Sequence, residues 1–142
     1  MVEHAFEHAD AERHARYPGA DDEVQQARRR ATVRRELRDR RDALAAAIAT
    51  RLPDWSVRIP GGGLVLWCDL GAPVSSALVV AGERHGLRLA AGPRFGLDGA
   101  FERRLRLPFT YSIDILDDAV DRLAAAYRSV AEGPAAQSRP TV

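Results

Sequence analysis

The most regular apolar pattern of the chain lies in residues 21–53, where large aliphatic residues recur at spacings of four and seven. This spacing predicts an amphipathic helix with a single apolar stripe. The stripe consists of Val33, Leu37, Leu44, Ile48 and Leu52. Asp21 or Asp22 can cap the start of this helix, and Pro53 ends it.

Two strand patterns follow. Trp55, Val57 and Ile59 alternate with polar residues, which is typical of a half-buried strand. The segment Leu64–Leu70 is apolar at both alternating sets of positions, so we expect it to be covered on both faces. The glycine turn between them makes these two segments partners of a predicted β-hairpin.

Two further strands are expected at Leu87–Ala90 and Arg103–Phe109. In the second of these, Leu105, Leu107 and Phe109 fall on one face, whereas Arg104 and Arg106 fall on the other.

Two more helices complete the pattern. One extends over residues 75–85, with Gly86 placed as its C-terminal glycine, and the other begins at Ser112 or Asp114 and stops at Gly133-Pro134. The apolar stripe of the last helix is Ile115, Leu116, Ala119, Val120, Leu123, Tyr127 and Val130. The element order predicts an α+β fold, in which helices pack against a mostly antiparallel sheet of about four strands.

Residues 54–132 are therefore the predicted domain, preceded by the long helix. The polar segments 1–20 and 133–142 carry little apolar surface, so we expect a frayed or disordered leader and a disordered tail.

The amino-acid composition excludes several kinds of functional site. The chain has 142 residues and a net charge of +1, and all 21 of its basic residues are arginines. The single cysteine, Cys68, excludes an intrachain disulfide and a cysteine-rich zinc site. No apolar run is long enough to span a membrane and no signal-peptide core precedes the first helix, so we expect a cytoplasmic protein without a membrane partner.

Three blocks occur in a specific order: PGGGLVLWCDL (60–70), ERHGLRLAAGPRFG (83–96) and LRLPF (105–109). With the helices between them, they resemble the C-terminal small domain of fold-type I aminotransferases, which depend on pyridoxal phosphate (PLP). The nearest resemblance is to the aminotransferase-like domain of MocR-type regulators of the GntR family, and it covers roughly residues 28–131.

The resemblance makes two arginines candidates for substrate binding, and the alternative for each is an arginine that only faces solvent. Arg106 matches the arginine that holds the substrate α-carboxylate in the family. Arg94 lies in the loop that shapes the mouth of the active site, where it could reach an anionic group. A planar guanidinium suits a carboxylate because it binds both oxygens and stays charged.

The resemblance also implies what lies elsewhere. In the family, a large domain holds PLP and supplies the Schiff-base lysine, and a winged helix-turn-helix in the regulators reads DNA. This sequence has no lysine at all. We therefore expect no catalytic residue, no cofactor and no activity for the chain alone, which would be a truncated, split or detached domain. Its expected partner is the large PLP-binding domain or a second copy.

Other interpretations remain open. One is that the chain docks as a free-standing interaction module on an aminotransferase-like protein. The arginine-rich segment 28–41 is a candidate for binding nucleic acid, although acidic residues are interspersed in it. A metal site at His4 and His8 is disfavoured because their segment has no core, and Trp55 and Trp67 are predicted to be core residues rather than platforms for stacking bases.

Overall fold

The computed structural model describes residues 19–92 and 101–137. The elements are α2 (Ala20–Arg51), β1 (Ser56–Arg58), β2 (Val65–Asp69), α3 (Ser75–Arg84), β3 (Ala90–Ala91), β4 (Arg104–Pro108) and α4 (Ile113–Gln137). The predicted α+β class and the predicted order of helices and strands are confirmed. The predicted leader up to residue 18 lies outside the described residues.

The chain divides into two compact units, residues 1–35 and 36–142. In the first unit, α2 exposes Val24 and Val33, each by about half of its surface. Val33 thus belongs to the apolar stripe by its spacing but is not buried, because nothing apolar in the described part of this unit covers it. In the second unit the stripe begins at the half-buried Leu37 and continues through Leu44 and Ile48.

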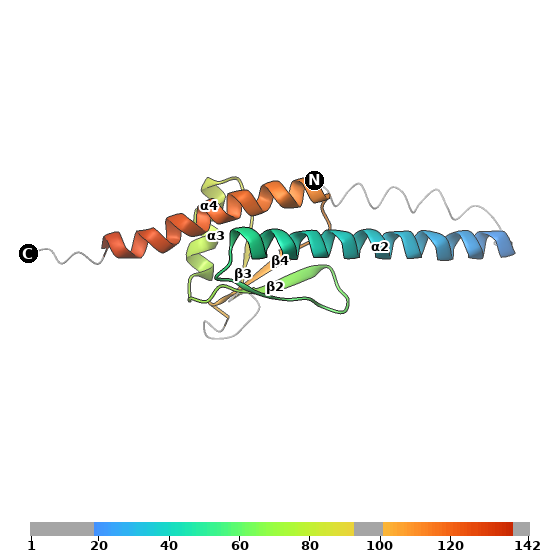
Figure 1. The fold of residues 1–142 in the computed structure, drawn as a ribbon, viewed down its shortest axis with the longest axis horizontal. Helices are drawn as coiled ribbons and strands as arrows, with labels where there is room; N and C mark the ends of the chain where they lie inside the picture. The colour runs from blue at the N-terminus through green and yellow to red at the C-terminus, as the bar shows by residue number, and fades with distance from the viewer. Residues whose placement is uncertain (1–18, 93–100, 138–142) are drawn as a thin grey trace, which may run out of the picture. The chain divides into compact units, whose positions relative to one another are not determined.

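The sheet has the strand order β1-β2-β4-β3, and every neighbouring pair is antiparallel. Figure 1 shows β2, β3 and β4 below α4. Strands β1 and β2 form the predicted hairpin, with Ser56 opposite Asp69. The central pair, β2 and β4, stays in register from Val65 opposite Pro108 to Asp69 opposite Arg104.

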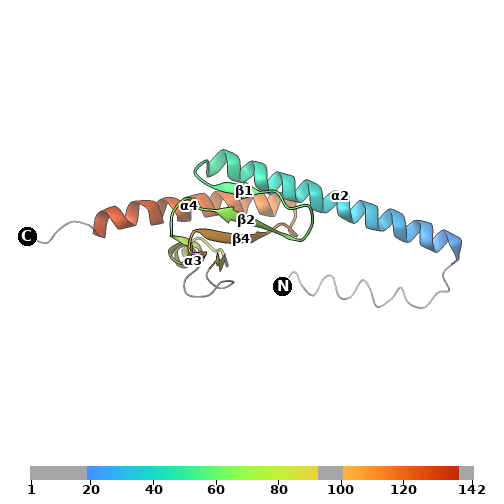
Figure 2. The same ribbon diagram turned by 90° about the horizontal axis from the view of Figure 1, so that it is seen from below.

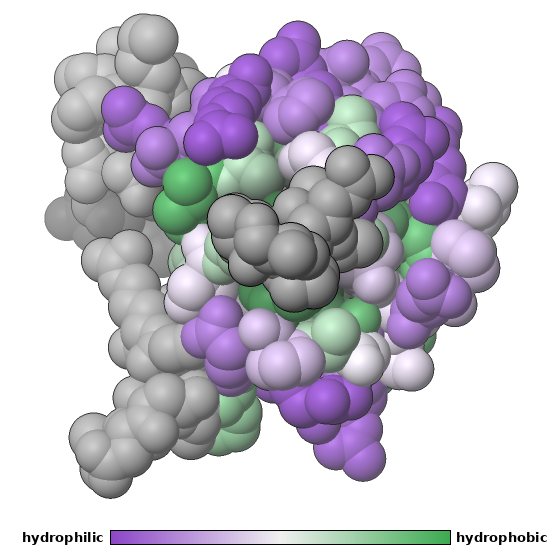
Figure 3. Space-filling model, turned by 90° about the vertical axis from the view of Figure 1, so that its left-hand side faces the viewer, coloured by the Kyte–Doolittle hydropathy of each residue, from purple (hydrophilic) through white to green (hydrophobic). Residues whose placement is uncertain are grey.

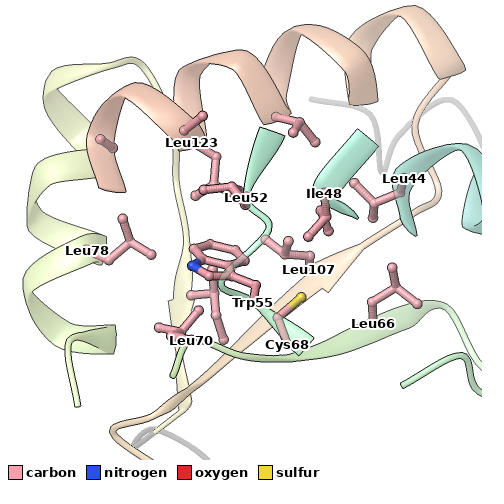
Figure 4. Packing of buried hydrophobic residues seen from close by; sticks show 14 of the residues in the cluster. Leu44, Ile48, Leu52, Trp55, Leu66, Cys68, Leu70, Leu78, Leu107 and Leu123 are labelled. Carbon is pink, nitrogen blue, oxygen red and sulfur yellow. The ribbon is translucent and has the colours of Figure 1, made fainter. Parts of the chain in front are cut away.

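One face of this sheet forms the core of the second unit. Leu66, Cys68 and Leu105 point to that face and are fully buried. They pack in one cluster with aliphatic residues of the three helices, among them Ile48 of α2 and Leu123 of α4 (Figure 4). Figure 2 shows the other side of the sheet, where the strands lie in front of α4. The helices α2, α3 and α4 therefore cover a single face of the sheet.

This one-sided arrangement corrects two expectations. Strand β2 is not covered on both faces, because Val65, Trp67 and Asp69 alternate with the buried residues and are only half-buried. Trp67 is therefore not a core residue. Trp55, by contrast, is 6% exposed and packs edge-on against the Tyr127 ring, with 5.4 Å between ring centroids.

Two apolar residues of the predicted patterns are exposed, one from the first strand and one from the stripe of the last helix. Ile59 is 49% exposed because β1 ends at Arg58, so the alternation of the strand stops before it. Ile115 is 53% exposed because the buried face of α4 begins at Leu116 and continues through Val120 and Leu123. Helical spacing from Leu116 places Ile115 on another side of the helix.

The third strand is shorter than predicted and lies later in the chain. Leu87 and Leu89 pack against the core, but backbone pairing with β4 is confined to Ala90 and Ala91. The reason lies at the end of α3. The Leu87 N–H donates to the Gly82 carbonyl at 2.9 Å, and the Gly86 N–H donates to the Glu83 carbonyl at 3.1 Å.

These two bonds form a Schellman motif around Gly86, whose φ is +78°, so its predicted role as the C-terminal glycine is confirmed. At the start of α4, the Ser112 carbonyl accepts the first helical hydrogen bond, from the Leu116 N–H at 2.9 Å. The expected stop at Gly133-Pro134 was wrong, because α4 continues to Gln137. Proline has a φ in the helical range, so a single missing donor does not have to end a helix.

Contacts between α2 and α4 close the second unit. Arg51 forms ion pairs with Asp117 at 2.7 Å and with Asp121 at 3.1 Å. The hydrogen bond to Asp117 is the main cause of a raised pKa at Arg51.

On the side of the molecule drawn in Figure 3, hydrophilic side chains dominate and hydrophobic areas are small. No helix in the described ranges is long and apolar enough to cross a membrane.

Candidate functional site on the outer face of the sheet

The sheet has a second face that points away from the helices, which we call the outer face. Its residues alternate with the core residues of β1, β2 and β4. They are Ser56, Arg58, Val65, Trp67, Asp69, Arg104, Arg106 and Pro108. Most of the chemistry-bearing side chains of the strands thus lie on the face that α2, α3 and α4 do not cover.

A row of three large side chains crosses the middle of the outer face. Trp67 of β2 lies directly opposite Arg58 of β1 on one side and opposite Arg106 of β4 on the other. Directly opposite residues of antiparallel strands share a face, with Cα atoms about 4.5–5.5 Å apart. Trp67 and Arg106 are half-buried, whereas Arg58 is exposed. The indole therefore stands between two guanidinium-bearing side chains.

Phe101 adds a second aromatic ring to this row. Its ring centroid lies 6.1 Å from that of Trp67, with an angle of 52° between the ring planes. Phe101 is 49% exposed, and its φ of +69° lies in the left-handed region, which residues other than glycine rarely adopt. The backbone just before β4 is thus held in an uncommon conformation beside the indole.

A second row contains an ion pair. Asp69 and Arg104 are opposite each other in the register, and the Arg104 Nη2 lies 3.7 Å from the Asp69 Oδ2. The other carboxylate oxygen of Asp69 accepts a hydrogen bond from the Gly71 N–H at 2.9 Å. Both side chains are partly exposed, so the pair contributes little to stability. It does partly neutralise the positive charge of Arg104.

A buried hydroxyl fixes the edge of the sheet near β3. Ser75, the first residue of α3, is fully buried, and its Oγ donates to the Arg104 carbonyl at 2.6 Å. The same Oγ accepts a hydrogen bond from the Gly92 N–H at 3.1 Å. These contacts tie the start of α3 to the backbone on both sides of segment 93–100.

The carboxylate of Glu102 caps the same helix start. It accepts hydrogen bonds from the Ser76 N–H at 2.7 Å and from the Ser76 Oγ at 2.9 Å. A carboxylate at the first turn of a helix satisfies free N–H groups and interacts favourably with the helix dipole. No local sequence pattern indicates this cap, because Glu102 is 26 residues away from Ser76.

The predicted site residues are placed as follows. Arg106 lies on the outer face with Arg104, opposite to Leu105 and Leu107, as the alternation predicted. Arg94 lies outside the described residues. Arg58 and Phe101 were not predicted as site residues. The hairpin register could have indicated Arg58, but the contact of Phe101 with Trp67 depends on a turn that no sequence pattern reveals.

The other candidate residues from the sequence make contacts that belong to the fold. In the arginine-rich segment, Arg40 donates to the Thr110 carbonyl at 2.7 Å and Arg41 donates to the Pro60 carbonyl at 3.2 Å.

Cys68 is buried as predicted, and burial raises the pKa of its thiol to about 12. Within the described ranges, no three His, Cys, Asp or Glu side chains come together as a metal site. His4 and His8 lie outside those ranges.

The comparisons with known proteins concern the fold. No protein-family model and no curated protein matches the chain. Among solved structures, it is similar to an α-aminoadipate aminotransferase from Thermus thermophilus, complexed with N-(5'-phosphopyridoxyl)-L-leucine, at 23% identity and a TM-score of 0.68. That match covers 75% of this chain and 28% of the aminotransferase.

Two further aminotransferases give the same result. A kynurenine aminotransferase from Pyrococcus horikoshii matches at 24% identity and a TM-score of 0.63, over 70% of this chain and 25% of its own. An aspartate transaminase from Corynebacterium glutamicum matches at 21% identity and a TM-score of 0.61, over 69% and 25%. The chain thus spans about a quarter of each of these aminotransferases, and over that span it has their fold.

Proposed function

We propose that the chain is the small domain of an aminotransferase-like protein and that Arg106 binds the carboxylate of an amino acid. The observation that carries this proposal is the position of Arg106. It is half-buried on the sheet face that α2, α3 and α4 leave uncovered, in a fold that forms part of aminotransferases. A guanidinium in this position can bind both carboxylate oxygens, and the aromatic side chain opposite it excludes water from one side.

The cofactor of such proteins has to be held elsewhere. PLP chemistry on amino acids needs a side-chain amine that forms an imine, and this sequence contains no lysine. The residues present therefore do not fit PLP as a cofactor of this chain alone. In our proposal the large domain supplies the cofactor site, and this chain contributes the carboxylate-binding guanidinium and is catalytically inert by itself.

We further propose that the domain belongs to a cytoplasmic MocR-type regulator. In such a regulator, amino-acid ligands control DNA binding by a winged-helix domain. The support is the resemblance of the sequence blocks at 60–70, 83–96 and 105–109. Reading the DNA upstream of the Met1 codon tests this form. We expect a large domain with a lysine and, before it, a winged helix; an unrelated fold in the same reading frame would contradict it.

Carboxylate binding is tested by NMR titration of the full chain with L-glutamine. We expect amide shifts around Arg106 and at the indole N–H of Trp67 in the wild type. These shifts should be lost in Arg106→Ala and weakened in Arg106→Lys, which keeps the charge but not the fork of donors. Arg84→Ala, an exposed substitution on α3, is the matched control. A titration of Arg106→Ala that matches the wild type would refute the proposed role.

The absence of cofactor binding is tested separately. The chain with a blocked N-terminus is mixed with PLP, and the absorbance band of an aldimine is sought. We expect none, because guanidinium groups do not form the imine. An adduct that borohydride reduces on the folded, blocked chain would contradict this expectation.

A second candidate function is that of an interaction module, which docks on an aminotransferase-like partner or on a second copy. It is favoured by the exposure of Phe101 and the half-exposure of Trp67 on the outer face. Sedimentation equilibrium tests the self-associating form. If the face is a dimer interface, Trp67→Ser should weaken the dimer, whereas a wild type that stays monomeric at every concentration excludes this form.

A further inference from the structure

The N-terminal part of α2 carries an arginine cluster that the proposed function does not use. We call residues 24–35 the basic segment, because they include five arginines and no acidic residue. The whole chain has a net charge of only +1, so the other residues together are negative. The positive charge of the protein is therefore concentrated in about three turns of one helix. The five arginines are Arg28, Arg29, Arg30, Arg34 and Arg35.

The fold of the described residues uses none of these guanidiniums. No ion pair or side-chain hydrogen bond within the described ranges involves any of the five. Arg40, later in α2, differs because it donates to the Thr110 carbonyl. Arg30 and Arg34 are four residues apart, a spacing at which like charges destabilise a helix. An anionic partner would relieve this repulsion.

The directions of the arginines indicate which anionic partner fits. Successive residues of a helix are about 100° apart, so Arg28, Arg29 and Arg30 point to three different sides. Every residue of 23–35 is exposed. A flat acidic surface contacts one side of a helix, whereas the two phosphate walls of a DNA major groove lie on either side of it. That groove is about 12 Å wide and admits an α-helix.

The apolar residues of the basic segment give no alternative docking face. Its two large apolar residues, Val24 and Val33, are each about half exposed. They are nine residues apart, which puts them on opposite sides of the helix. The segment therefore has no apolar stripe with which to enter a membrane surface or to pack against a helix of another protein.

We infer that the basic segment of α2 binds double-stranded DNA through its phosphates, with the helix lying in the major groove. The five guanidiniums are spread over about 11 Å of helix axis, and each can neutralise one phosphate. Contacts to phosphates carry no sequence information, so binding should not depend on base sequence. The inference uses neither Arg106 nor the outer face, so its failure would leave the proposed function unchanged.

Fluorescence anisotropy tests the inference, with the full chain titrated into a short, labelled DNA duplex of mixed sequence at several NaCl concentrations. We expect the logarithm of the association constant to fall linearly with the logarithm of the salt concentration, with a slope of about −4.5 for five phosphate contacts. The triple variant Arg29→Gln/Arg30→Gln/Arg34→Gln should bind more weakly. Its slope should be smaller by about 0.9 for each arginine removed. Glutamine removes the charge but keeps a similar helix propensity.

A matched control variant replaces three exposed arginines outside α2, namely Arg84, Arg88 and Arg128, by glutamine. It changes the net charge equally and should keep the slope of the wild type. Circular dichroism shows that both variants are folded. Equal losses of binding in the two variants, or no binding by the wild type at low salt, would overturn the inference. Poly-L-glutamate or phosphatidylglycerol vesicles that bind as tightly as the duplex would overturn it as well, because the partner would then be an acidic protein or a membrane.

Discussion

The hydroxyl of Ser75 donates a hydrogen bond to the carbonyl oxygen of Arg104, 2.6 Å away and 29 residues later in the chain. Because the same hydroxyl accepts the Gly92 N–H, one small side chain satisfies two backbone groups on different segments. Ser75 is fully buried, so water does not replace it. This contact holds in place the strand that carries Arg106.

We expect Ser75→Ala to destabilise the fold by about 1–3 kcal/mol, because it leaves a buried donor and a buried acceptor unpaired. Urea unfolding followed by circular dichroism measures the change. Ser56→Ala is the control, since Ser56 is exposed on β1 and should change the free energy of unfolding little. Equal effects of the two substitutions would show that the Ser75 contacts do not matter for stability.

Gly92 should not tolerate a side chain. A Cβ at this position would meet the carbonyl oxygen of Phe101 and would come within 2.5 Å of that of Arg104. Both are backbone atoms, so relief requires a movement of β4, and we expect Gly92→Ala to cost about 1–3 kcal/mol. Gly62→Ala is the matched control, because a Cβ there has open space. A thermal melt of each variant measures the difference in stability.

The two tryptophans should differ in their contribution to stability. Trp55 is buried among the core residues, so Trp55→Ala should destabilise the fold by about 3–5 kcal/mol. Trp67 is half-buried on the outer face, and Trp67→Ala should cost about 1–2 kcal/mol, in proportion to the smaller buried area. Chemical denaturation of both variants tests this order. The reverse order would mean that the outer face is the better-packed side.

Cys68 should make stability depend on alkaline pH. Burial raises the pKa of its thiol from 9.0 to about 12, so above pH 9 the unfolded chain loses this proton before the folded chain does. The contribution is fully present below pH 9 and is lost as the pH rises toward 12. Unfolding titrations should show a slope that is steeper in the wild type than in Cys68→Ala, by up to about 1.4 kcal/mol per pH unit. Equal slopes would contradict the burial of the thiol.

The sequence predicted the fold better than the site. Helical and alternating periodicity located the helices and strands of the described residues, the third strand only approximately, because one-sided burial leaves a regular pattern along the chain. It misassigned Ile59 and Ile115, since apolar residues one position beyond a buried face continue the pattern without sharing the face. The third strand was predicted to start too early for another reason: the Leu87 N–H is already bonded at the end of α3.

The outer face was only partly predictable. Alternation in β4 placed Arg106 opposite to the leucines, and this placement is confirmed. Trp67 was expected in the core because hydropathy does not reveal that the helices cover only one face of the sheet. The row from Arg58 to Arg106 needs the register of two strand pairs, which depends on turn geometry and on long-range packing rather than on local sequence.

The strand order also limits what can attach to the rim of the sheet. The outermost strands, β1 with three residues and β3 with two, are the shortest in the sheet. A short outer strand offers few unpaired backbone groups as a template for a strand from another molecule, and native proteins use this to avoid aggregation. Amyloid-like growth by strand addition is thus disfavoured at both margins of the four-stranded sheet, even though β2 is rich in apolar residues.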